Sequence, residues 1–294
     1  MTADGIADIS SRRSDHAIVS GITRGSRSNF YYSFLFLPRP QREAIHAVYA
    51  FCRCVDDAVD AASDKSAART ELARWRTELA AAFGEGSPAD PVTRDLALHA
   101  ARMNLSRGPL EEVIRGVEMD LTQRRYESFE DLSVYCRRVA SAVGHSCVEI
   151  FGSRGAASMR YATTMGLAFQ MTNILRDLRS DCQQGRFYLP AEEMRRFGYS
   201  SEEAAAGRGG PAFEALMEFQ CRRAEALFRR SDAEFPKEER RKLFAAEIMG
   251  AIYRRILSRI AGRPAAVLEG RVTLPRGHRL ALAAGLYIRA RLLS

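Results

Sequence analysis

The sequence has 294 residues, of which 46% are hydrophobic and 27% are charged, and its formal net charge is +8. This composition is that of a soluble globular protein with a substantial core, and no apolar run reaches the ~18 residues of a membrane-spanning helix. A basic stripe with interleaved aromatic residues is missing, so we expect no nucleic-acid partner.

Residues 1–25 mix Asp, Arg, Ser and Gly without an apolar segment, and we interpret them as a flexible leader rather than a signal peptide. Residues 26–294 read as one all-α domain, because apolar residues recur at three- and four-residue spacing and strand-like alternation is missing. Gly- and Pro-rich breakers divide the domain into helices. Helices are expected at 39–62, 67–83, 92–103, 109–124, 129–151, 155–181, 210–234, 237–261 and 277–293.

The first of these helices carries aspartates in an apolar setting, "YAFCRCVDDAVD". Asp56 and Asp60 lie four residues apart and share a helix face with Arg53 and Tyr49. A solvated acidic face is the alternative interpretation, but such faces favour Glu over Asp, which has a low helix propensity. Carboxylates held roughly 5–6 Å apart repel each other unless a cation neutralises them.

A second oxygen-bearing stripe follows in "FQMTNILRDLRSD". Asn173, Asp177 and Asp181 recur every four residues, with Gln170 one turn earlier and Arg176 beside them. If the two stripes face each other, they form a box of hard oxygen ligands, which favours Mg²⁺ bound together with a diphosphate. Arginines at this box would clamp the phosphates, although surface ion pairs are an equally ordinary role for them.

The surrounding stretches carry a resemblance. The sequences "DDAVD" after "YAFCR", "NILRDLRSD", and "YESFEDLSVYCRRVASAVG" between them resemble the squalene and phytoene synthase family of head-to-head trans-prenyl transferases. "SNFYYSFLFLPRPQREAIHAVYAFCR", "GRFYLP" and "AAEIMGAIYRRIL" extend the resemblance over residues 26–261. The sequence around "GRFYLP" and "AAEIMGAIYRRIL" is similar to that of bacterial presqualene diphosphate synthases of hopanoid biosynthesis.

The resemblance implies a single-domain isoprenoid-synthase helical bundle with a central cavity. It implies that the metal ligands are Asp56, Asp60, Asn173, Asp177 and Asp181. It implies that substrate contacts come from Ser28, Asn29, Phe30, Tyr49, Arg53, Gln170, Arg176 and Tyr253. It places Tyr135 beside the reacting carbons, in a catalytic set with Arg53, Asp56, Asp60 and Asp177. Ser141 departs from the family pattern, because many relatives have glycine there, so packing near the cavity is expected to differ.

The implied reaction joins two farnesyl diphosphates head to head into presqualene diphosphate, releasing diphosphate, for squalene or hopanoid biosynthesis. Two or three Mg²⁺ ions are expected, and NADPH is not expected to take part. Either Tyr135 or a diphosphate oxygen could accept the proton. Squalene, dehydrosqualene and phytoene are alternative products. A single-substrate terpene cyclase and a non-enzymatic helical adaptor are more distant alternatives.

The cysteines and the C-terminus suggest where the protein works. Six scattered cysteines form no zinc-type pairs, which is typical of reduced thiols in a cytoplasmic protein. The basic net charge and a partly apolar C-terminal segment are compatible with peripheral attachment to anionic membrane lipids at the inner membrane face. The oligomeric state is not readable from the sequence.

Overall fold

The fold is seen in a computed structural model that describes residues 3–25 and 33–292, and within these ranges the chain is helical and contains no strand. The long helices are α1 (Ala3–Gly25), α3 (Arg39–Asp60), α4 (Lys65–Ala82), α5 (Pro91–Met103), α6 (Arg107–Met119), α9 (Ala156–Gln183), α12 (Pro211–Glu234), α13 (Arg240–Gly262) and α15 (Arg276–Leu292). The shorter ones are α7 (Phe129–Cys136), the π-helix η1 (Arg137–Ser141), α8 (Ala142–Ile150), α10 (Ala191–Arg196), α11 (Ser201–Ala206), the 3₁₀-helix η2 (Lys237–Glu239) and α14 (Ala266–Glu269). The expected all-α class is confirmed.

Local sequence signals account for several helix ends. The side chain of Asp64 accepts hydrogen bonds from the first turn of α4, and Asp90 caps α5 in the same way. Ser128 and Asp131 form a capping box at the start of α7. Asn104 ends α5 in the left-handed conformation, which asparagine adopts more readily than most residues. These caps satisfy backbone groups that would otherwise lack partners.

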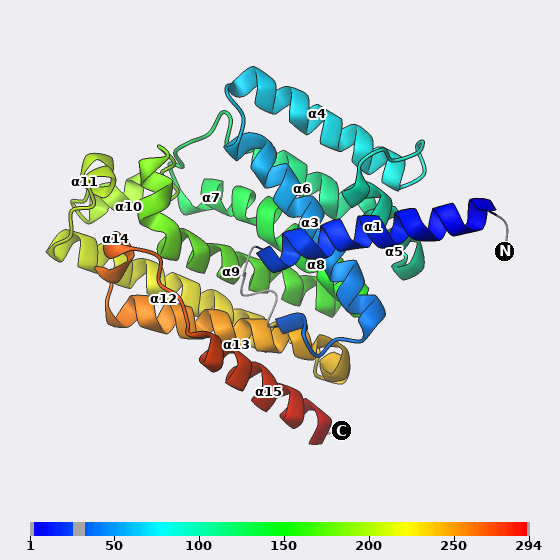
Figure 1. The fold of residues 1–294 in the computed structure, drawn as a ribbon. Coiled ribbons are helices and arrows are strands. Elements are labelled where there is room, and N and C mark those ends of the chain that lie inside the picture. Colours follow the sequence, from blue (N-terminus) through cyan, green and yellow to red (C-terminus); the bar gives the residue numbers. More distant parts are fainter. Residues whose placement is uncertain (1–2, 26–32, 293–294) are drawn as a thin grey trace.

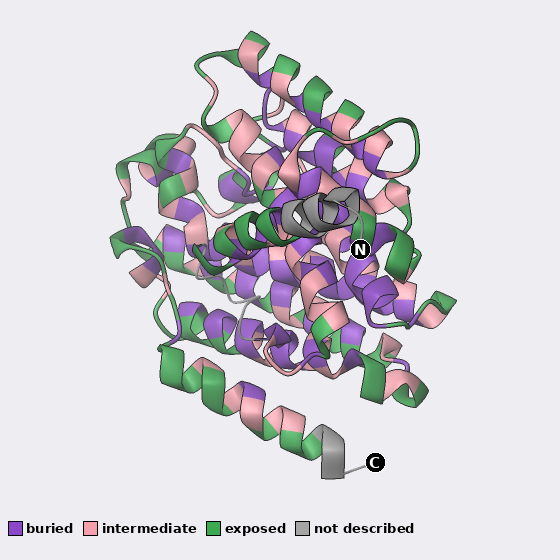
Figure 2. Ribbon diagram, turned by 45° about the vertical axis from the view of Figure 1, so that its right-hand side comes forward, coloured by how far each residue is buried: buried purple, intermediate pink, exposed green. Residues whose placement is uncertain are grey.

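Helix α9 runs through the middle of the molecule, with α12 and α13 on one side and α7, η1 and α8 on another (Figure 1). Helix α3 packs on α4, α5, α6 and α8, and α15 packs along α13 at the edge of the fold. Figure 2 shows buried residues concentrated on the inward faces of these helices, while most of α15 is exposed or half-buried. The arrangement brings α3 and α9 to opposite sides of one interior space.

Helix η1 lies unusually close to α9. A Cβ atom added to Gly166 would lie 2.6 Å from the Cα atom of Ser141, so only glycine fits there. A Cβ atom added to Gly116 of α6 would lie 2.6 Å from the side chain of Val139 in η1. The hydroxyl group of Ser141 donates a 2.7 Å hydrogen bond to the carbonyl oxygen of Thr163. The serine at this position therefore ties η1 to α9 beside the cavity.

Most expected helices are present within two or three residues of their expected bounds. The helix expected at 109–124 ends earlier, at Met119, and the one expected at 129–151 is interrupted by η1. The short helices α10, α11 and α14 were not expected.

The segment expected as a flexible leader contains α1, which packs on α3 and α5 with Val19 fully buried. The division of the chain into a leader and a domain at residue 26 stays a prediction, although α1 packs as part of the core.

Candidate active site

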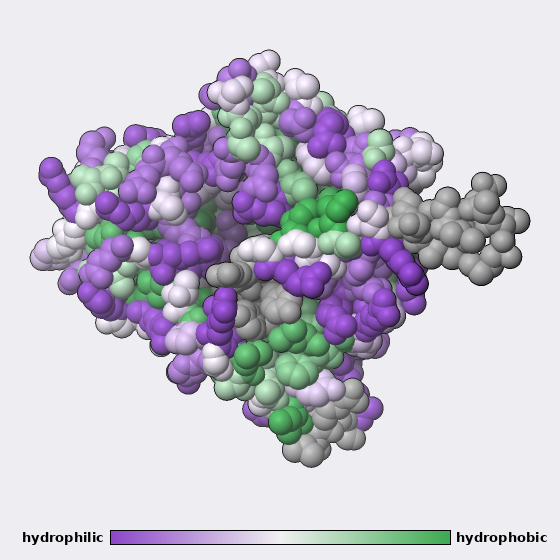
Figure 3. Space-filling view, viewed as in Figure 1, coloured by the Kyte–Doolittle hydropathy of each residue, from purple (hydrophilic) through white to green (hydrophobic). Residues whose placement is uncertain are grey.

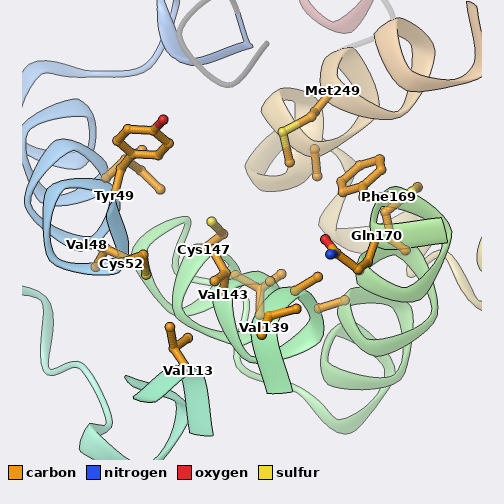
Figure 4. Close-up of a pocket in the computed structure, with 18 of the residues that line it drawn as sticks. Val48, Tyr49, Cys52, Val113, Val139, Val143, Cys147, Phe169, Gln170 and Met249 are labelled. Atoms are coloured by element: carbon orange, nitrogen blue, oxygen red, sulfur yellow. The ribbon is translucent and has the colours of Figure 1, made fainter. Parts of the chain in front are cut away.

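A cavity of about 300 Å³ lies between α3, α6, η1, α8, α9 and α13. Its wall is mainly apolar, and Figure 4 shows Tyr49 of α3 on one side and Phe169 of α9 with Met249 of α13 on the other. Val139 and Val143 lie between them. Tyr161 and Asn173 are the first and last α9 residues along this wall, a rise of about 18 Å at 1.5 Å per residue. The polar residues gather toward the Asn173 end.

Helix α3 contributes one polar wall of this end. Tyr49, Arg53 and Asp56 line the cavity together, as their shared helix face predicts. Arg53 pairs with Asp57 at 2.5 Å and approaches Asp56 at 3.6 Å. The side chain of Asp56 is 46% exposed, yet the surrounding protein desolvates its carboxylate. This desolvation, together with Asp60, raises the pKa of Asp56 to about 6.

Helix α9 contributes the opposite polar wall. Gln170 and Asn173 line the cavity, and Asp177 and Asp181 continue the same stripe beyond it. Burial and the charge on Asp177 raise the pKa of Asp181 to about 7. Burial also acts to raise the pKa of Asp177, but hydrogen bonds from Arg176 and Arg271 outweigh it and hold this pKa below its ordinary value.

Asp120, which follows α6, and Arg186, which follows α9, connect the two polar walls of the site. Arg186 pairs with Asp60 at 2.5 Å, and Arg186 and Asp120 both interact electrostatically with Asp56 of α3 and with Asp181 of α9. The two aspartate stripes therefore converge on the same region. Their charges are partly balanced by arginines, through the pairs of Asp57, Asp60 and Asp177 with Arg53, Arg186 and Arg176.

The donor set fits Mg²⁺. It consists of carboxylate and amide oxygens, which Mg²⁺ prefers. The oxygen Oδ1 of Asn173 is buried and has no hydrogen-bond partner, while its amide nitrogen donates to Gln170 at 3.3 Å. A buried carbonyl oxygen without a partner is costly, and a cation would satisfy it. Among the described residues, no three of these aspartates bring their oxygens within 4.8 Å of one another, so the cluster is open rather than a closed cage.

Tyr135 sits in a buried hydrogen-bond network. Its hydroxyl group donates to Asp120 at 3.2 Å and lies 3.1 Å from the hydroxyl group of Tyr188, which donates to Asp120 at 2.9 Å. Burial raises the pKa of Tyr135 well above its ordinary value, and burial also raises the pKa of Asp120. Tyr135 lines the cavity, and its hydroxyl group is neutral and bonded to Asp120 and Tyr188.

An aromatic pair lies beside the polar end. The rings of Phe169 and Tyr253 are 4.5 Å apart, and both line the cavity. Tyr253 also forms a hydrogen bond with Arg176, which is 6% exposed and pairs with Asp177. The aromatic faces and the buried guanidinium group thus meet next to the aspartates of α9. Aromatic faces attract cations.

Two cysteines, one half-buried and one buried, complete the wall. Cys52 of α3 and Cys147 of α8 line the cavity, and Figure 4 shows Cys52 on the α3 side and Cys147 nearer the middle. Both are unpaired, and burial raises the pKa of Cys147 to about 12. These thiols stay protonated and act as part of the apolar wall.

Sequence reasoning found one part of this site and missed another. Of the expected residues, Tyr49, Arg53, Asp56, Tyr135, Gln170, Asn173 and Tyr253 line the cavity. Asp60, Arg176, Asp177 and Asp181 adjoin its polar end through the contacts above. Ser28, Asn29 and Phe30 lie outside the described residues. Asp120, Arg186, Tyr188 and Arg271 were not expected; the "RFYLP" stretch, already noted for its resemblance, held the signal for two of them.

Comparison with known proteins identifies the family. The family profile described as squalene/phytoene synthase matches residues 23–278. The chain is 36% identical over 262 residues to a phytoene synthase of Mycobacterium tuberculosis, covering 88% of this chain and 86% of that protein. It is 35% identical over 263 residues to a presqualene diphosphate synthase of Rhodopseudomonas palustris, covering 89% and 93%.

Solved structures agree. A dehydrosqualene synthase crystallised with a ligand superposes with a TM-score of 0.84 at 27% identity, covering 95% of this chain and 98% of that one. A squalene synthase from Alicyclobacillus acidocaldarius gives 0.68 at 29% identity, covering 95% of each chain. A helical prenyltransferase of isoprenoid biosynthesis is thus the class that fold and site define. The chain belongs to the squalene/phytoene synthase family.

Proposed function

We propose that the protein joins two farnesyl diphosphates head to head into presqualene diphosphate, with release of diphosphate and a proton, for squalene or hopanoid biosynthesis. The observation that carries the reaction class is the partnerless oxygen of Asn173 at the polar end of an apolar cavity. A silent adaptor has no physical reason to bury such an oxygen beside two stripes of aspartates.

Asp56, Asp60, Asn173, Asp177 and Asp181 would hold two or three Mg²⁺ ions. Bound Mg²⁺ neutralises the negative charge that develops on a departing diphosphate. Arg53, Arg176, Arg186 and Arg271 already pair with the aspartates of this region. These arginines would bind the phosphate oxygens when the carboxylates turn to the metal.

The rest of the cavity protects the reacting carbons. When the bond between carbon and diphosphate breaks, an allylic cation forms, and the double bond of the second substrate attacks it. Water would intercept this cation, so the apolar wall must exclude water. The faces of Phe169 and Tyr253 lie where they can stabilise positive charge.

Closure of the cyclopropane ring releases a proton. Tyr135 is neutral and already donates to Asp120, so it can accept this proton only while passing its own to Asp120. An oxygen of the released diphosphate is the other acceptor. Replacing Tyr135 with Phe separates these routes, because only the first requires the hydroxyl group.

The decisive experiment incubates the purified protein with farnesyl diphosphate and Mg²⁺, with and without NADPH, and identifies the products. Presqualene diphosphate that accumulates even with NADPH would support the proposal. Squalene formed only with NADPH would assign the complete squalene synthase reaction. No product from either mixture would contradict the proposal.

Phytoene synthesis from two geranylgeranyl diphosphates is a second candidate, because the identity to a phytoene synthase is 36%. We favour the shorter substrate because bulky Tyr161 and Met165 line the end of the cavity farthest along α9 from Asn173. Replacing Tyr161 with Ala should raise turnover of the C20 substrate relative to the C15 substrate at least about tenfold, since each methylene accommodated is worth about 1–3 kcal/mol. An unchanged ratio in a competition assay would refute this assignment of the cavity end.

We also propose that the protein works in the cytoplasm, attached to the inner membrane face, where the long hydrocarbon chains of its product would be delivered. Of the described helices, none is long and apolar enough to cross a bilayer. Hydrophobic residues show over and beside α15 in Figure 3, and Leu280 and Ile288 of that helix are exposed. All six cysteines are unpaired, which suits a reducing compartment.

A further inference from the structure

A second polar cluster lies between α1 and α5, helices that pack side by side (Figure 1). It consists of His16 on α1 and of Asp95 and His99, which are four residues apart on α5. Asp95 and His99 are each only 3% exposed. Their possible ligand atoms and one ring nitrogen of His16 all lie within 4.8 Å of one another. Of the described residues that line the active-site cavity, none belongs to this cluster.

The cluster does not satisfy its own polar atoms. Oδ1 of Asp95 lies 3.7 Å from Nδ1 of His16, and Oδ2 lies 3.8 Å from Nε2 of His99. Both distances exceed the roughly 3.2 Å limit of a sound hydrogen bond. Oδ2 of Asp95 and Nδ1 of His99 are buried and have no hydrogen-bond partner. A buried carboxylate in this state is costly unless a cation accompanies it.

A proton alone accounts for part of the cluster. Protonated His16 would neutralise Asp95 across the 3.7 Å contact, and Glu43 lies 3.9 Å from the other nitrogen of His16. That arrangement still leaves Oδ2 of Asp95 and His99 unbonded inside the protein. A cation bound by all three side chains would neutralise the buried carboxylate of Asp95 and take one ring nitrogen of His99.

We propose that His16, Asp95 and His99 bind one divalent transition-metal ion, for which Zn²⁺ is the best fit, and that this ion fixes α1 to α5. Two imidazoles and one carboxylate are a zinc donor set, unlike the all-oxygen set of the active site. At bond lengths of ~2.0–2.1 Å, ligand atoms of a tetrahedral site are about 3.4 Å apart. The two carboxylate oxygens of Asp95 lie close to this distance from the imidazoles, Oδ1 at 3.7 Å from His16 and Oδ2 at 3.8 Å from His99. A water molecule would take the fourth position.

The surroundings of His16 suit this role. Nε2 of His16 lies 3.3 Å from the hydroxyl group of Ser20, with a carboxylate oxygen of Glu43 nearby. Metal-bound histidines commonly donate their second nitrogen to such a group, which fixes the ring orientation. This contact leaves Nδ1 of His16 facing Asp95 and available to the metal.

The test uses the full chain, stripped with a chelator and then titrated with Zn²⁺ in the presence of excess Mg²⁺, which occupies the aspartate region. We expect one tight zinc per chain. Replacement of His99 by Gln should weaken zinc binding at least tenfold, and replacement of His16 by Gln should do the same. Replacement of the exposed His278 on α15 by Gln is the matched control and should leave binding unchanged.

Co²⁺ substitution gives a readout independent of enzyme activity. Four-coordinate Co²⁺ bound to imidazole absorbs visible light strongly, whereas Co²⁺ held by carboxylates and water absorbs weakly. The strong band should appear in the parent chain and in His278→Gln but not in His99→Gln. If the parent chain, whose fold is not in question, binds no zinc under excess Mg²⁺, or if His99→Gln binds as tightly while folded, the proposal is wrong.

Discussion

At the scale of residues, Asn173 links the local hydrogen bonding of α9 to the proposed metal site. Asn173 lines the cavity, its amide nitrogen donates a hydrogen bond to Gln170, and its buried amide oxygen has no hydrogen-bond partner. Aspartate at the same position would add a third negative charge to a stripe in which the charge on Asp177 already raises the pKa of Asp181. An amide supplies an oxygen ligand without that repulsion.

Replacement of Asn173 by Ala should therefore weaken the use of Mg²⁺. We expect kcat/KM for farnesyl diphosphate to fall at least about tenfold, in line with the effect of removing groups that support metal sites. The concentration of Mg²⁺ needed for half-maximal turnover should rise as well. Replacement of Gln183, exposed at the end of the same helix, by Ala should change neither quantity. An Asn173→Ala enzyme with parental Mg²⁺ dependence would remove this residue from the metal site.

Asp181 should give the metal-free protein a distinctive pH dependence. Its pKa is about 7 in the folded chain and ~3.9 when unfolded, so the folded state holds the proton more tightly. Its contribution to stability is thus full below about pH 4 and is lost as the pH rises through 7. With chelator present, Asp181→Asn should be more stable than the parent by ~1–3 kcal/mol at pH 8, a figure reduced for partial exposure.

The comparison is made by urea unfolding at pH 8 and at pH 4, where the gain should vanish. With Mg²⁺ and diphosphate present, the parent should be more stable than Asp181→Asn at pH 8, because only the parent has the Asp181 carboxylate that would bind the metal. A gain of equal size at both pH values would show that packing rather than ionisation is responsible.

The sequence predicted these residues to different extents. Four-residue spacing is a local property, so Asp56, Asp177 and Asp181 could be found from one helix at a time. Arg271 reaches Asp177 from a segment 94 positions away, and Asp120 meets Tyr188 from 68 positions away. Such pairs exist only after packing, so no spacing rule reveals them.

At the scale of elements, the π-helix η1 shapes the cavity wall. Its apolar spacing is indistinguishable from that of an ordinary helix, so the sequence predicted one uninterrupted helix from 129 to 151. What distinguishes the π-helix from an ordinary α-helix here is its close contact with α9, which the glycine at position 166 allows. π-bulges of this kind are frequently found at functional sites.

Replacement of Gly166 by Ala should push η1 away from α9. Because the new Cβ atom would meet backbone atoms of Ser141, which cannot swing aside, we expect a loss of ~1–3 kcal/mol in the free energy of unfolding. Gly285 in the exposed middle of α15 has open space around it, so Gly285→Ala should be neutral or up to about 1 kcal/mol stabilising. Chemical denaturation measures both; equal effects would mean that the close approach has no energetic weight.

At the scale of the whole molecule, α15 is a largely exposed helix laid along the edge of the bundle. Tyr287 anchors it by stacking on Phe36 at 4.6 Å and contacting Phe244, while Leu280 and Ile288 face outward. The chain's net charge of +8 would add attraction to anionic lipids. The periodicity of apolar residues was enough to predict the all-α class and the order of the helices. It could not predict which face of α15 is exposed, because that depends on the tertiary contacts of the helix.

Replacement of Ile288 by Glu should reduce binding to vesicles of anionic phospholipid, since it places a charge on the exposed apolar face. Co-sedimentation with such vesicles should fall several-fold, while turnover of dissolved farnesyl diphosphate stays the same. Leu98→Glu is the control, at a leucine of α5 that is 42% exposed against 55% for Ile288, and it should bind vesicles as before. Equal loss in both variants, or none in either, would argue against α15 as the attachment site.

The sulfur atoms in the cavity wall have a practical consequence. Because Cys52 and Cys147 are held as neutral thiols, they are poor nucleophiles toward electrophilic drugs and slow to be oxidised by peroxide. An inhibitor designed to fill this cavity would gain little from a cysteine-directed reactive group. The same inertness should let the purified enzyme keep its activity during prolonged storage in air.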